Sequence, residues 1–463
     1  MNRRILLKQL MMGLPAAALL PSFLNSCAKE VLLENFKFKG SVLVIGAGAS
    51  GIYAANLLRN YGAQVTQLEA RSVIGGRMLA NTSISGIKIE LGAEEIHGKR
   101  SILYDLAQFN LPESLLPIPG DDYYFLENQL RSKNFLIESA SLEGAGATLF
   151  QIIDSFASYP GGAQSVTQYL AEKQVDVRFL EIANALIGNE YGTDNGKIGM
   201  LALKEAEEGY SSGEDGQMLK DKSFVELFEI AFQSDIDQIK LNKPVESINY
   251  EGTQVMVTTE NGESFTADKI LITVPLSILK NNSITFVPPL AADKLDAINT
   301  IKMENGFKII LQFNAPFWEG NTGSIIGGTK VPEYWVTGAG KNENSNLITA
   351  FVMGEKAEYL SGLSEAQLIT EILEELALIY PTGNVSGKYN GINIIQNWGN
   401  EPYIEGAYSY PSPGSEGKRS ILAAPINNKI YFAGEATNFN GHLATVHGAM
   451  ESAYRATKEI LEA

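Results

Sequence analysis

Cysteine is nearly absent from this chain of 463 residues, because Cys27 is the only one. A single cysteine excludes a disulfide within the chain, a cysteine-based metal site and a cysteine nucleophile in the body of the protein. We therefore expect no metal centre. The 44 glycines gather in particular loops and form no low-complexity tract, so the sequence does not indicate a disordered chain.

Positive charge is also scarce, since the formal net charge is −17 at pH 7. Such a surface repels nucleic acid, which we exclude as a partner, and attracts cations. The excess acid serves either solubility or the steering of a cationic substrate. The length and the 45% hydrophobic content predict two cores with a cleft between them.

The apolar run at residues 10–24 falls short of the roughly 20 residues that a membrane-spanning helix needs. Because Arg3 and Arg4 precede this run, residues 1–27 are typical of a cleaved signal peptide, with a buried N-terminal helix as the alternative. The start resembles a twin-arginine signal, and the Leu-Asn-Ser-Cys ending at Cys27 resembles a lipobox, although Asn25 is unusual there. We expect an exported bacterial protein, periplasmic or attached to the membrane as a lipoprotein.

A glycine-rich turn lies between a predicted strand at 41–45 and a predicted helix that runs to Asn60. This turn contains Gly46, Gly48, Ala49 and Gly51. In this spacing the first glycine permits the turn, the second lets a pyrophosphate approach the backbone, and the third lets the helix pack closely on the strand. Glu69 ends the next strand, where a carboxylate binds a ribose diol. The pattern predicts a dinucleotide-binding βαβ unit.

A second glycine turn distinguishes FAD from NAD as the dinucleotide. Arg71 follows Glu69, and Gly75 and Gly76 lead directly into Arg77, whose guanidinium can neutralise phosphate charge. The alternative is that Arg77 pairs with a surface acid. We expect Gly76, Arg77 and Arg71 to contact FAD.

These motifs resemble the flavin amine oxidase family, which includes monoamine oxidases, polyamine oxidases and histone demethylases. In motif style, the sequence is most similar to the polyamine oxidases. The matching segments are EARSVIGGR, residues 90–93 and 96–98, VPLSIL, FVPPL, NGFKIILQF, Asn397-Trp398, GAYSY and residues 431–450.

The resemblance implies an α/β flavoprotein with two domains. A Rossmann-like FAD-binding domain would comprise residues 38–110, 233–285 and 396–463. An α+β substrate-binding domain would comprise the discontinuous segments 111–232 and 286–395. The helical region from about residue 111 to residue 232 resembles the family least, and it would set substrate choice.

The resemblance also assigns further cofactor-binding residues. Glu435, after Gly434, would hold the ribityl chain, and the backbone at Thr445 and Val446 would face the pyrimidine end of the flavin. A helix N-terminus there would stabilise negative charge on reduced flavin. Glu435 could instead cap a helix. Val245 and Trp398 complete the predicted cofactor-binding set.

Three residues are implied to be catalytic. Lys308 matches the lysine that holds a water against the reactive flavin nitrogen, although it could point out of a half-exposed strand. Tyr408 would form an aromatic wall of the amine site. His97 matches a substrate-contacting histidine of polyamine oxidases, although it could bind a loop carbonyl instead.

Departures from the family pattern limit the activity that the resemblance implies. Ala407 stands where monoamine oxidases carry the cysteine that binds flavin, so FAD should be non-covalent. Thr445 stands in place of a second tyrosine, so the pocket should be more open. Glu95 replaces an aromatic residue, and it either recognises a distal ammonium or is solvated.

The implied function is flavin-dependent oxidation of CH–NH or CH–NH₂ donors, with hydride passing to flavin and O₂ reduced to H₂O₂. A small amine, with a polyamine as one candidate by the resemblance, and O₂ would be the partners; the oligomeric state is left open. An L-amino-acid oxidase needs an arginine that is not matched at Ala93, Glu94 or Glu95. A desaturase-type or other flavin-dependent dehydrogenase and a non-catalytic FAD-bearing protein are further alternatives.

Overall fold

The computed structural model describes residues 38–213, 215–342 and 345–463. The expected signal segment and Cys27 lie outside these residues, so the twin-arginine and lipoprotein predictions stay predictions. Across the described ranges, no helix has both the length and the apolar character needed to cross a bilayer.

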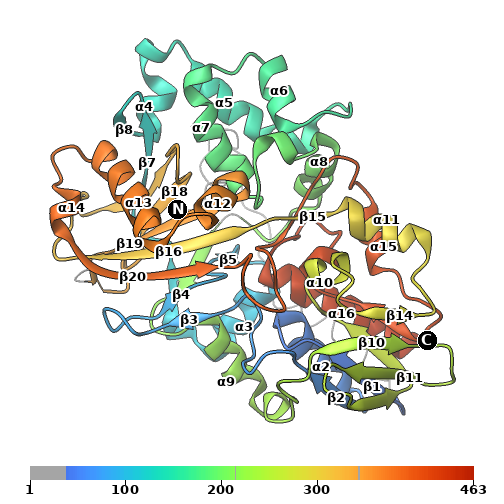
Figure 1. Ribbon diagram of the computed structural model, residues 1–463. Coiled ribbons are helices and arrows are strands. Elements are labelled where there is room, and N and C mark those ends of the chain that lie inside the picture. Colours follow the sequence, from blue (N-terminus) through green and yellow to red (C-terminus); the bar gives the residue numbers. More distant parts are fainter. Residues whose placement is uncertain (1–37, 214, 343–344) are drawn as a thin grey trace, which may run out of the picture.

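A parallel sheet of four strands, in the order β2-β1-β13-β22, lies in the lower part of Figure 1. The strands are Gln64–Leu68, Ser41–Ile45, Lys269–Ile272 and Ile430–Phe432. The central strands are buried on both faces, which explains their continuous β-branched sequence. The strand predicted at 41–45 thus pairs with the strand predicted to end at Glu69, although β2 ends one residue earlier, at Leu68.

Two helices, α2 (Ala49–Asn60) and α16 (Val446–Glu462), pack together beside this sheet. Their buried small residues allow the close approach, among them Ala54 on α2 and Ala453 and Ala456 on α16. The first and last parts of the described chain therefore share one hydrophobic core.

A sheet of seven strands forms the second layer, in the order β20-β16-β19-β18-β17-β7-β8. The strands are Tyr389–Asn397, Gly306–Phe313, Leu347–Met353, Glu333–Val336, Thr322–Ile326, Asp121–Leu126 and Gln129–Ser132. Helix α13 (Glu365–Ile379) buries its apolar side chains in the core of this sheet. Helices α4 to α8, within residues 133–209, lie above it in Figure 1.

The region up to residue 232, which is predicted to be helical, also contains strands. Besides its helices, residues 101–232 contain β6 (Leu115–Pro117), β7, β8 and β9 (Gly216–Leu219). β7 pairs in parallel with β17, about 200 residues further along the chain. Local propensity cannot reveal such a strand, because its stability comes from a distant partner.

Helix α9 (Phe224–Ile236) spans the domain boundary that is predicted between residues 232 and 233, and its backbone is kinked at Phe232. Phe224, Phe228 and Phe232 on α9 pack in one hydrophobic cluster with Ile52 of α2. The helix thus packs against the part of the chain that carries the glycine turn.

Candidate active site

A cavity of about 520 Å³ lies where the two sheet-containing parts of the molecule meet. Cavities of about 300 to 1,000 Å³ are typical of cofactor and small-molecule sites. All of the predicted site residues except Gly51 line this cavity. The structure therefore gathers residues from both ends and the middle of the chain.

The glycine turn between β1 and α2 shows why Gly51 does not line the cavity. A Cβ atom on Gly51 would lie 2.1 Å from the carbonyl oxygen of Gly46, whereas a Cβ on Gly48 would have no neighbour nearer than 3.9 Å. Gly51 thus permits close packing beneath the turn, and Gly48 leaves its backbone open to the cavity.

The start of α2 fits an anionic group. Its N-cap, Gly48, supplies no side chain to the first backbone N–H groups. The Ser50 hydroxyl oxygen is buried beside the cavity and has no hydrogen-bond partner in the described protein. A phosphate would satisfy donors of this kind, because a helix N-terminus carries partial positive charge.

Glu69 is held at the end of β2 by two backbone amides. Its Oε2 accepts a hydrogen bond from Ala47 N (2.7 Å), and its Oε1 accepts one from Arg71 N (2.9 Å). Burial raises the pKa of Glu69 despite these bonds. Arg71 itself pairs with Glu401 at 2.6 Å, so its guanidinium is held within the protein.

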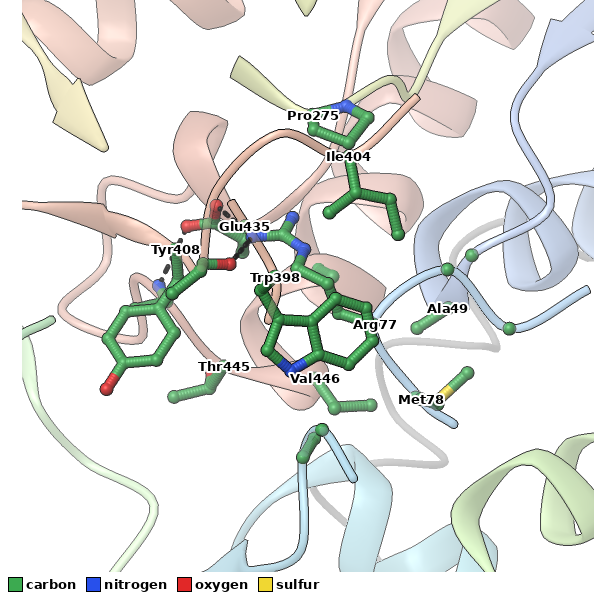
Figure 2. Close-up of a pocket in the computed structure, with 18 of the residues that line it drawn as sticks. Ala49, Arg77, Met78, Pro275, Trp398, Ile404, Tyr408, Glu435, Thr445 and Val446 are labelled. Carbon is green, nitrogen blue, oxygen red and sulfur yellow. Dashed lines mark hydrogen bonds and ion pairs between the residues drawn. The ribbon is translucent and has the colours of Figure 1, made fainter. Parts of the chain in front are cut away.

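Arg77 and Glu435 form an ion pair in the middle of the site (Figure 2). Arg77 Nη1 lies 3.0 Å from Glu435 Oε1 and 2.8 Å from the carbonyl oxygen of Ala407. Glu435 Oε2 accepts bonds from Ser409 Oγ (2.6 Å) and Ala444 N (3.1 Å). The pair therefore joins the second glycine turn to the last strand and the final helix.

Arg419 stands behind this pair and was not predicted. Its Nη1 donates to Ser409 Oγ at 2.7 Å, and the side chain is buried. Burial lowers the pKa of Arg419 to about 10, although the nearby Glu435 carboxylate opposes the shift. No sequence motif marks this residue, because its role depends on contact with Ser409.

The N-terminus of α16 faces the cavity beside Gly434. Thr445 is the N-cap, and its Oγ1 accepts a hydrogen bond from Gly448 N at 2.9 Å. Thr445 and Val446 both line the cavity, and Figure 2 shows them near Tyr408 and Trp398. Backbone N–H groups at this helix start can stabilise negative charge.

Lys308 on β16 is buried, which contradicts the outward-pointing alternative. Its Nζ lies 2.8 Å from Glu94 Oε2 and donates to the carbonyl oxygen of Glu90 at 3.1 Å. The ammonium also lies 4.9 Å from the centre of the Trp335 ring. No sequence pattern predicts the ion pair with Glu94, because the two residues are 214 positions apart.

Tyr408 and Trp398 are fixed by hydrogen bonds at the cavity wall. The Tyr408 hydroxyl donates to the carbonyl oxygen of Glu190 at 3.1 Å, and Trp398 Nε1 donates to that of Leu91 at 2.9 Å. His97 also lines the cavity, with its Nδ1 3.8 Å from Glu95 Oε2. Glu95 thus belongs to the site wall rather than to a remote loop.

The cavity wall carries more acid than base. Within the described chain, its lysines and arginines are Arg71, Arg77, Lys243 and Lys308, each ion-paired with a carboxylate, and His97 lies beside Glu95. Further carboxylates line the cavity, among them Asp122 and Glu333 on strands of the seven-stranded sheet. Glu95 and Glu190 are others. This excess of carboxylates favours a cationic ligand.

The family model for flavin containing amine oxidoreductases matches residues 49–461. The chain belongs to this family. Lysine-specific histone demethylase 2 from Homo sapiens is 28% identical over 462 residues, covering 94% of this chain and 55% of that protein. The chain thus spans about half the length of this relative.

Two further similar proteins are matched over almost their full length. Polyamine oxidase 4 from Oryza sativa subsp. japonica is 27% identical, covering 95% of this chain and 91% of that protein. Wild-type putrescine oxidase, solved with putrescine bound, has a similar fold, with a TM-score of 0.76 and 20% sequence identity. The match covers 92% of this chain and 100% of the putrescine oxidase chain. The predicted family, fold class and flavin cofactor are confirmed, whereas the roles of single residues stay predictions.

Glu90 gives the site a pH-dependent contribution to stability. Burial raises the pKa of Glu90 to about 8, although the Phe224 amide, whose N lies 2.6 Å from Oε1, opposes the shift. Because the unfolded carboxyl has a pKa of about 4.3, the folded state holds an extra proton between these values, and stability falls as the pH rises through this window.

We therefore expect Glu90→Gln to gain stability relative to the wild type as the pH rises from about 5 to about 8, by about 2 to 4 kcal/mol in total. Urea unfolding across this range measures the difference. Glu138→Gln, which removes an exposed carboxyl on α4 (Lys133–Glu138), is the matched control. A difference for Glu90→Gln that stays constant with pH would contradict the prediction.

Proposed function

We propose that the chain is an FAD-dependent amine oxidase that oxidises the C–N bond of a primary or secondary amine and reduces O₂ to H₂O₂. The observation that carries this proposal is that one cavity joins the glycine turn to Lys308, Tyr408 and Trp398. Bound FAD would supply a hydride acceptor for the carbon next to nitrogen and a route for the electrons to oxygen.

The cavity offers a matching surface for each charged part of FAD. The α2 N-terminus and Ser50 suit the pyrophosphate, and the Glu69 carboxylate suits a ribose diol. The α16 N-terminus suits the pyrimidine end. We infer that these three places hold the cofactor, with Arg77 fixed by Glu435 beside them.

The aromatic wall prepares the amine. An alkyl amine has a pKa of about 10.4 by analogy with lysine, so it arrives protonated and has no lone pair to assist hydride departure. Contact with Tyr408 and Trp398 removes water from the nitrogen and favours its neutral form. Such rings bind an ammonium before it loses its proton.

We also propose that the substrate carries a second ammonium, as a diamine or polyamine does. The lysines and arginines of the described cavity wall are each ion-paired with a carboxylate. The wall holds more carboxylates than basic side chains, Glu95, Asp122, Glu190 and Glu333 among them, and this acidic balance supports the substrate class. The family relative named polyamine oxidase 4 agrees with it. The same pairing disfavours an amino acid, whose carboxylate needs an available cation.

Removing the charge of Glu333 tests this class of substrate. We expect Glu333→Gln, at a buried position of the cavity wall, to raise KM for 1,4-diaminobutane about tenfold, because one charge-assisted hydrogen bond is lost. KM for butylamine should change less than twofold. Steady-state peroxide assays with both amines measure the ratio, and an equal rise for both would contradict a distal ammonium site.

FAD should be held without a covalent bond. Ala407 lines the cavity and offers no nucleophile, and its carbonyl oxygen accepts a hydrogen bond from Arg77. Acid precipitation of the pure holoprotein should therefore leave all of the yellow flavin in the supernatant. Flavin that sediments with the protein would contradict this prediction.

Anaerobic addition of amines to the holoprotein tests the function as a whole. Loss of the flavin absorbance with amines, followed by peroxide when air is admitted, is the expected result. Bleaching by L-amino acids alone would favour an amino-acid oxidase. A flavin that no amine or amino acid bleaches would favour a non-catalytic FAD-bearing protein.

We propose that the protein is exported and that Cys27 is acylated. Arg3, Arg4, the apolar run at 10–24 and Cys27 support this location. Metabolic labelling with a fatty acid tests it, and Cys27→Ser is the control that should remain unlabelled.

A further inference from the structure

A buried carboxylate, Glu94, lies between two lysines at the cavity wall. Glu94 Oε2 is 2.8 Å from Lys308 Nζ, and Glu94 Oε1 is 3.6 Å from Lys341 Nζ. The exposed fractions of the Glu94, Lys308 and Lys341 side chains are 11%, 4% and 1%. Ion pairs that are this buried are screened little by salt.

The three residues come from different parts of the fold. Glu94 precedes β5 (Ile96–His97), Lys308 is on β16, and Lys341 follows β18. Lys341 also donates to the carbonyl oxygen of Lys88 at 3.2 Å. Glu94 therefore lies on a loop that lines the cavity, between Ala93 and Glu95, and its carboxylate holds the Lys308 ammonium in place.

The two ammoniums keep the Glu94 carboxyl ionised. Burial alone would raise its pKa, but Lys308 and Lys341 reverse this effect and hold the pKa of Glu94 below its ordinary value. With both lysines protonated, the group carries one net positive charge. Glu90 is mostly protonated near neutral pH and adds little charge, because burial raises its pKa to about 8.

We propose that Glu94 is a positioning residue for Lys308: it holds the ammonium against the cavity wall and offsets part of its charge, and thereby sets how readily bound flavin accepts electrons. The inference rests on the proposed function, in which Lys308 lies beside the flavin. A carboxylate in the wall of the flavin cavity opposes the extra negative charge of the reduced form.

The test is the midpoint potential of the bound flavin, measured by reductive titration with dithionite and a reference dye. Glu94→Gln keeps the size of the side chain and removes its charge. We expect the ratio of reduced to oxidised flavin at a given potential to rise at least tenfold, which for a two-electron couple is a shift of about 30 mV to a more positive value.

Three further variants separate charge from folding. Glu94→Asp keeps the charge and should restore a potential close to that of the wild type. Lys341→Gln removes a positive charge and should shift the potential in the opposite direction. Glu181→Gln, which breaks a surface ion pair with Lys356 at 2.6 Å, is the matched control and should leave it unchanged.

A potential of Glu94→Gln equal to that of the wild type would overturn the proposal. If Glu94→Gln does not fold, an unshifted potential in Lys341→Gln would overturn it instead. The titration uses dithionite rather than an amine, so it remains informative if no amine proves to be a substrate, and the two proposals can fail separately.

Discussion

Lys308→Met is expected to slow the reaction of reduced enzyme with oxygen by about a hundredfold or more, with flavin still bound. A buried ammonium offsets the negative charge that develops as oxygen takes up electrons, and loss of one such group costs about 10² to 10³ in rate. Methionine retains the packing against Trp335, and Glu94 keeps its second partner, Lys341.

Stopped-flow mixing of dithionite-reduced protein with oxygenated buffer measures this rate directly. Lys302→Met, which removes an exposed lysine on β15 (Lys302–Met303), is the control. A variant at Lys308 that reoxidises within threefold of the wild type would show that this lysine has no part in the oxygen reaction.

Gly51→Ala and Gly48→Ala, both in the first glycine turn, are expected to have different effects. Gly51→Ala brings a Cβ to 2.1 Å from the carbonyl oxygen of Gly46, so α2 must shift away from β1 and the apoprotein should lose about 2 kcal/mol or more of stability. Gly48→Ala meets no atom nearer than 3.9 Å, so the apoprotein should keep its stability.

Flavin binding should nevertheless weaken at least a hundredfold in Gly48→Ala, because the new methyl group occupies the space through which the pyrophosphate approaches the backbone. Urea unfolding of the apoproteins and fluorescence titration with FAD separate the two effects. Tight FAD binding by Gly48→Ala would place the pyrophosphate elsewhere in the cavity.

The cofactor side of the site could be predicted because its signals are local. The spacing of Gly46, Gly48 and Gly51 is a requirement of one turn, and it lies between a strand and a helix that their own sequences indicate. Glu69 comes at the end of the next strand for the same reason. Such features need no knowledge of distant contacts.

The other side of the site depends on contacts between remote residues. Lys308 and Glu94 are 214 positions apart, and neither has a neighbour in sequence that indicates the pair. Arg419 acts through Ser409, and the carboxylates of Asp122 and Glu333 meet at the cavity only because β7 joins the sheet that contains β18. The sequence shows these residue types but not their proximity.

Because α2 and α16 share one hydrophobic core, the cofactor site can form only after both helices have been synthesised. Strand β22 and helix α16 occupy residues 430–462, so a nascent chain on the ribosome lacks one wall of the cofactor cradle until this segment has emerged. Flavin capture therefore requires this segment, and fragments that stop before residue 446 should emerge as apoprotein, however much FAD the cell contains.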